Sequence, residues 1–166
     1  MIAHRGNELV LAIYPQSSGF AFVLFKNWDV PLDFGAYEVR GGEKNTRCLK
    51  RVESLLALHS PDVLVLQHMS KSDNRSPRIQ QLNRNIAELG KAYDLAVHTY
   101  RRAEVRESFA RHFDAATKQR IAETIAQQIP ALNLYLPPER KPWRSEHVRM
   151  GIFEAAALAW MYFHNH

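Results

Sequence analysis

Four polar residues stand at positions that could belong to a metal site. Tyr14 ends one apolar run, Gln67 ends another, and Glu154 begins an alanine-rich segment near the end of the chain. His147 precedes Glu154 by seven residues, so a helix through both would place them on one face. Imidazole favours Zn, Ni or Mn over Mg, and two ligands alone bind weakly. His147 and Glu154 are the best candidate metal pair, with a polar helix face over a shallow pocket as the alternative.

Basic residues suggest a polyanionic partner. The formal net charge is +5, which favours nucleic-acid phosphates through counterion release. The cations nearest the candidate site are expected to contact phosphates, and they are Arg75, Arg78, Arg140, Lys141 and Arg144. Trp143, among the last three, could stack on an unpaired base or be tucked under its loop. For the basic clusters of the first helix and of the segment after residue 100, solvated helix faces are the favoured interpretation.

Alternating apolar patterns predict the elements that position these residues. Three short strands near 9–13, 20–25 and 33–39 indicate an antiparallel meander. Apolar stripes then predict helices over 44–58, around 79–89, around 105–113 and around 121–129, with buried strands at 62–66 and 95–100 between them. The proline-rich segment 137–144 predicts a rigid loop, and Ser145 a cap for the last helix.

Length and composition limit the class of protein. A chain of 166 residues fits one domain, 1–166, and no apolar run is long enough to cross a membrane. The single cysteine, Cys48, excludes an internal disulfide and a cysteine-based zinc cage, and a reducing cytoplasm is the expected location. The segment Ser17-Ser18-Gly19 is too short and too poor in glycine for a phosphate loop, so no nucleotide cofactor is expected.

The order of elements, together with three short motifs, resembles the RuvC-type Holliday-junction resolvases over nearly the whole chain. The motifs are the hairpin through 9–25, the segment Pro61-Asp-Val-Leu-Val-Leu-Gln67 with the helix after it, and Glu154-Ala-Ala-Ala-Leu-Ala159. The resemblance implies a ribonuclease H-like α/β fold, in which a mixed five-stranded sheet carries helices on both faces. It also implies a homodimer; the stripe Ile79, Leu82, Ile86 and Leu89 could serve the dimer or face the core.

The same resemblance implies a nuclease centre in which acidic side chains hold two divalent metals. Its acids correspond here to Tyr14, Gln67, Gly151 and Glu154, so only Glu154 remains. A phenol is protonated at neutral pH and an amide carries no charge, which makes both poor ligands for Mg²⁺. A rebuilt site from Asp73, Glu146, His147 and Glu154 is the alternative for an active enzyme using Mg²⁺ or Mn²⁺.

Three hypotheses follow. The first is a resolvase-like protein that binds structured or branched nucleic acid without cutting it and needs no cofactor. The second is an active metal-dependent endonuclease with relocated ligands. The third is an interaction subunit without a nucleic-acid role, which pairs with itself or with a competent relative.

Overall fold

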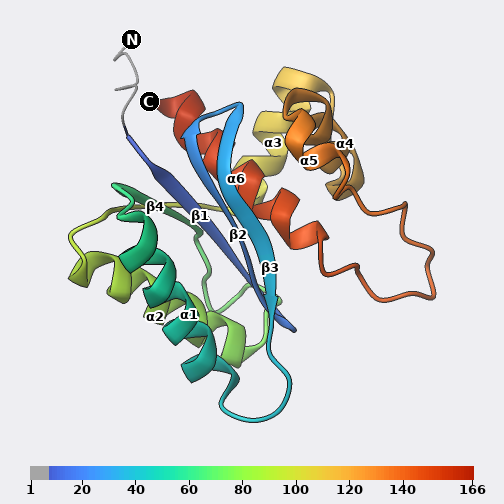
Figure 1. Ribbon diagram of the computed structural model, residues 1–166. Helices are drawn as coiled ribbons and strands as arrows, with labels where there is room; N and C mark the ends of the chain where they lie inside the picture. Colours follow the sequence, from blue (N-terminus) through green and yellow to red (C-terminus); the bar gives the residue numbers. More distant parts are fainter. Residues whose placement is uncertain (1–7) are drawn as a thin grey trace.

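A computed structural model describes residues 8–166, which form one mixed sheet between two layers of helices (Figure 1). The strands are β1 (Val10–Gln16), β2 (Gly19–Asn27), β3 (Val30–Glu38), β4 (Val63–Gln67) and β5 (Ala96–Tyr100). The helices are α1 (Lys44–His59), α2 (Pro77–Ala92), α3 (Arg102–Phe113), α4 (Lys118–Gln128), α5 (Pro130–Asn133) and α6 (Met150–Asn165). The short helix α5 was not predicted.

The sheet order is β3-β2-β1-β4-β5. Strands β1, β2 and β3 pair antiparallel, whereas β4 pairs parallel with both β1 and β5. The predicted mixed five-stranded sheet is therefore confirmed. Strand β1 lies at its centre and continues past Tyr14 to Gln16, further than the sequence indicated. A close approach of β3 requires Gly19 at the β1–β2 turn, because a Cβ there would lie 1.9 Å from the carbonyl oxygen of Tyr37.

Two apolar cores hold the layers together. Helices α1 and α2 cover one face of the sheet, and α6, α3 and α4 cover the other (Figure 1). In the α2 stripe, Leu82 and Ile86 belong to the core under the sheet, Leu89 packs partly buried against it, and Ile79 is also buried, so the stripe faces the core. Within the described residues, no helix is long and apolar enough to span a membrane.

The segment between α5 and α6 projects from the body as a long loop, as the prolines predicted (Figure 1). Ser145 does not cap α6, which begins five residues later at Met150. The chain between them passes through a turn in which the amide of Met150 donates to the carbonyl of His147. The prediction that His147 and Glu154 share a helix face is therefore wrong.

Candidate nucleic-acid site at the edge of the sheet

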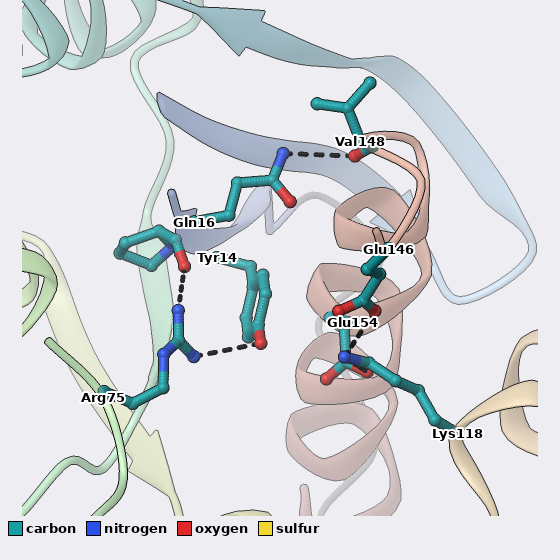
Figure 2. Close-up of polar contacts among 8 residues, drawn as sticks. Tyr14, Gln16, Arg75, Lys118, Glu146, Val148 and Glu154 are labelled. Atoms are coloured by element: carbon teal, nitrogen blue, oxygen red, sulfur yellow. Dashed lines mark hydrogen bonds and ion pairs between the residues drawn. The ribbon is translucent and has the colours of Figure 1, made fainter. Parts of the chain in front are cut away.

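Tyr14 is packed into the molecule at the edge where β1 and β4 end. Its side chain is 9% exposed, and the Arg75 guanidinium stacks on its ring, 4.9 Å from the centroid. Arg75 Nη1 donates to the Tyr14 hydroxyl at 3.0 Å, and Nη2 donates to the Pro15 carbonyl at 2.6 Å (Figure 2). Burial and the nearby Glu154 carboxylate raise the pKa of Tyr14 despite Arg75. The phenol therefore stays protonated and offers no anionic oxygen to a metal.

Gly151 lets α6 approach the β1–β2 hairpin closely. A Cβ at this position would lie 2.5 Å from Gln16 Oε1 and 2.8 Å from the Ala21 Cβ. Gln16 also donates from Nε2 to the carbonyl of Val148 at 3.1 Å, so its amide fills the space beside the helix (Figure 2). The position where the resemblance expects an acid is thus a packing contact with no room for a carboxylate.

Glu154, the one acid at an expected position, is paired with a cation of the chain itself. Lys118, at the start of α4, places Nζ 2.5 Å from Glu146 Oε1 and 3.6 Å from Glu154 Oε1 (Figure 2). Burial raises the pKa of Glu154, and the shared Lys118 does not fully offset it. Burial alone would lower the pKa of Lys118, but Glu154, Tyr14 and Glu146 together raise it, so the ammonium stays charged.

A small cavity of about 20 Å³ opens beside Glu154 and Lys118. Gln67, at the end of β4 and 6% exposed, contributes its buried side chain to the wall. The remaining lining residues are Arg102, Val105 and Arg106 from α3, Ile121 from α4, and Ala157 and Leu158 from α6. The site is therefore a small cavity between α3, α4, α6 and the end of β4, with mostly apolar walls and charged side chains among its lining residues.

The four residues of the relocated set are not all brought together: Glu146 and Glu154 share Lys118, but Asp73 and His147 have other partners. Asp73 accepts hydrogen bonds from the amide and hydroxyl of Ser70, which lower its pKa and fix its own loop. His147 Nδ1 accepts from the amide of Arg149 at 3.1 Å in the turn before α6. Across residues 8–166, no three His, Cys, Asp or Glu side chains lie close enough to hold a metal ion. The residues present do not fit a two-metal centre.

The predicted phosphate contacts fall into two groups. Arg78, like Arg75, is half-buried and holds the β1–β2 turn, donating to the carbonyl of Ser17 at 3.2 Å and to Asn45 Oδ1 at 3.0 Å. The other group lies on the projecting loop and is exposed: Arg140, Lys141, Trp143 and Arg144. Trp143 is 76% exposed, with Lys141 Nζ 5.5 Å from its ring centroid, so it is not tucked under the loop.

Sequence reasoning missed Lys118 and set aside Arg102 and Arg106, which line the cavity. A signal for Lys118 was present, because it precedes the buried Ile121 and Ile125 by three and seven residues. That spacing places the lysine on the inward face of its helix. A charged residue on an apolar stripe indicates a buried ion pair.

No family model and no curated protein matches the chain, but solved structures share its fold. Thermus thermophilus RuvC in complex with a Holliday junction substrate superposes with a TM-score of 0.67 at 14% identity, covering 95% of this chain and 96% of that one. Another Thermus thermophilus RuvC structure gives 0.63 at 13% identity, with the same coverage. The yeast mitochondrial Holliday junction resolvase Ydc2 gives 0.61 at 12% identity, covering 96% of this chain and 80% of that one. The chain has the RuvC-like, ribonuclease H-like fold.

Proposed function

We propose that the protein binds structured or branched nucleic acid, as a resolvase-like protein without two-metal cleavage. The observation that carries this proposal is the ion pair of Lys118 with Glu146 and Glu154. An ammonium held by both carboxylates supplies the positive charge that a divalent ion would otherwise bring, so a metal would have to displace it. Tyr14 and Gly151 support the same conclusion, since one is neutral and the other leaves no space.

The nucleic-acid part of the proposal rests on the fold and on the exposed cations. The three structures above belong to junction resolvases, one of them with its junction bound. The net charge of +5 and the exposed loop cations suit a phosphate backbone, and Trp143 offers an aromatic face for an unpaired base. We further propose a cytoplasmic homodimer acting in DNA recombination or repair; sedimentation velocity tests the dimer.

The test incubates labelled four-way junctions, duplexes and single strands with the protein and Mg²⁺ or Mn²⁺. We expect binding that weakens steeply with salt, and no cleavage. Cleavage that disappears in Glu154→Ala would overturn the proposal in favour of an active endonuclease with relocated ligands. If the protein bound none of these substrates at low salt, only the hypothesis of an interaction subunit without a nucleic-acid role would remain.

Trp143→Ala tests the aromatic face. A stacked base contributes about 1–3 kcal/mol, so single-strand affinity should fall at least about fivefold without a change in melting temperature. Leu134→Ala is the matched control, because Leu134 is 86% exposed near the start of the same loop but has no aromatic ring. Equal single-strand affinities for the two variants would show that Trp143 does not stack on a base.

A further inference from the structure

The cavity beside Glu154 carries more positive charge than the protein itself neutralises. Arg102 and Arg106 lie one helical turn apart on α3, both exposed, and neither forms an ion pair within residues 8–166. With Lys118 they make three cations, against the two carboxylates of Glu146 and Glu154. Unpaired guanidinium groups at the mouth of a cavity attract an anion, and their planar donors suit phosphate oxygens.

The interior of the cavity also offers a hydrogen-bond donor. Gln67 is only 6% exposed. Its side-chain amide lines the cavity and makes no hydrogen bond with another residue of the described chain. The amide atoms keep some solvent contact, so their donor is open to a ligand or a water. The volume of about 20 Å³ admits a water-sized group and so a single phosphate oxygen.

We infer that this cavity is a binding site for one backbone phosphate of the nucleic acid, clamped by Arg102 and Arg106 with one oxygen directed toward Gln67 and Lys118. The inference rests on the proposed function and names the part of its ligand that enters the site. The apolar walls formed by Val105, Ile121 and Leu158 exclude water and strengthen these contacts. The chain's own cations then hold the phosphate without a bridging metal.

The test compares two double variants that remove the same charge from opposite faces of the sheet. The cavity variant, Arg102→Gln with Arg106→Gln, removes both positive charges from the mouth of the cavity. Arg51→Gln with Arg84→Gln removes two arginines from α1 and α2, in the other helix layer. Anisotropy of a labelled four-way junction is measured with EDTA over a KCl series from about 50 to 200 mM.

We expect the cavity variant to bind about tenfold more weakly than the control variant at the lower salt concentration. The slope of log K against log [KCl] should fall by about 0.9, the value for a single phosphate. A fall of about 1.8 would mean that each arginine holds its own phosphate, which overturns the clamp. So would a cavity variant that binds as tightly as the control.

Gln67→Glu gives a second readout that preserves size. In EDTA, a carboxylate at this position should repel the phosphate oxygen and weaken junction binding about tenfold, with the melting temperature recorded alongside. Unchanged affinity in a folded variant would overturn the placement of the oxygen. If the wild-type protein binds and the cavity variants do not differ from it, only this inference fails. If the wild-type protein does not bind at all, the proposed function fails with it.

Discussion

The two sides of the candidate site differ in what surrounds the positions where the resemblance expects acids. On the packed side, formed by Tyr14, Gln16, Ala21, Arg75 and Gly151, side chains fill the available space and satisfy one another. On the polar side, formed by Gln67, Arg102, Arg106, Lys118, Glu146 and Glu154, charged groups still surround a cavity. The first side is filled by packed side chains, whereas the second keeps a cavity among paired charges, and it is the side to which we assign the proposed phosphate.

The largest expected effect comes from restoring an acid on the packed side. Gly151→Asp should lower the free energy of unfolding by about 3 kcal/mol, because its Cβ overlaps Gln16 and Ala21 and its carboxylate is buried. Urea denaturation measures the change. Gly42→Asp is the control, since a Cβ there meets no atom within 4 Å. Equal free energies of unfolding for the two variants would show that the packing around residue 151 can rearrange to accommodate an aspartate.

On the polar side, removing the cation should cost less and create a metal response. Lys118→Met leaves Glu146 and Glu154 facing each other without the ammonium, and we expect a loss of about 1–2 kcal/mol at neutral pH. Mn²⁺ should then raise the melting temperature of this variant while leaving the wild-type protein unchanged. Lys91→Met, on the exposed end of α2, controls for the loss of a surface charge. A wild-type protein that Mn²⁺ stabilises equally would contradict the idea that Lys118 takes the metal's role.

The pH dependence of stability tests how far Lys118 compensates Glu154. Because burial raises the pKa of Glu154, the native state holds this proton more tightly than the unfolded state. Stability from this group is complete below the ordinary value of 4.5 and is lost as pH rises toward the raised pKa. Glu154→Gln should therefore gain stability relative to the wild-type protein as pH rises from 4.5 to neutrality, whereas Glu88→Gln, exposed on α2, should not. Urea denaturation across this pH range measures the difference. If Glu154→Gln instead gained stability relative to the wild-type protein as pH falls, the attraction of Lys118 for Glu154 would outweigh the effect of burial.

The sequence predicted the fold well because strands and helices follow from local apolar periods. It named Glu154 and Tyr14 as candidate site residues, but it could not locate the side chains that contact them. Lys118 reaches Glu154 from a helix 36 residues away, a contact that depends on how α4 packs on α6. His147 was misplaced because Val148 and Arg149 form a turn before α6 without a sequence signal for it. Elements are determined by local sequence, whereas this site is determined by packing between elements.

The smallest change separates hydrogen bonding from packing at Tyr14. Tyr14→Phe keeps the ring under Arg75 and removes only the hydroxyl that accepts from Nη1, so we expect a loss of about 1 kcal/mol. Tyr37→Phe is the control, because Tyr37 also lies under an arginine, Arg51, but its hydroxyl makes no hydrogen bond within residues 8–166. Urea denaturation of both variants gives the difference. Since Arg75 also donates to Pro15, it should stay in place in Tyr14→Phe, and junction affinity should not change. A change in affinity at constant stability would instead place Tyr14 in the interface and extend the binding site onto the packed side.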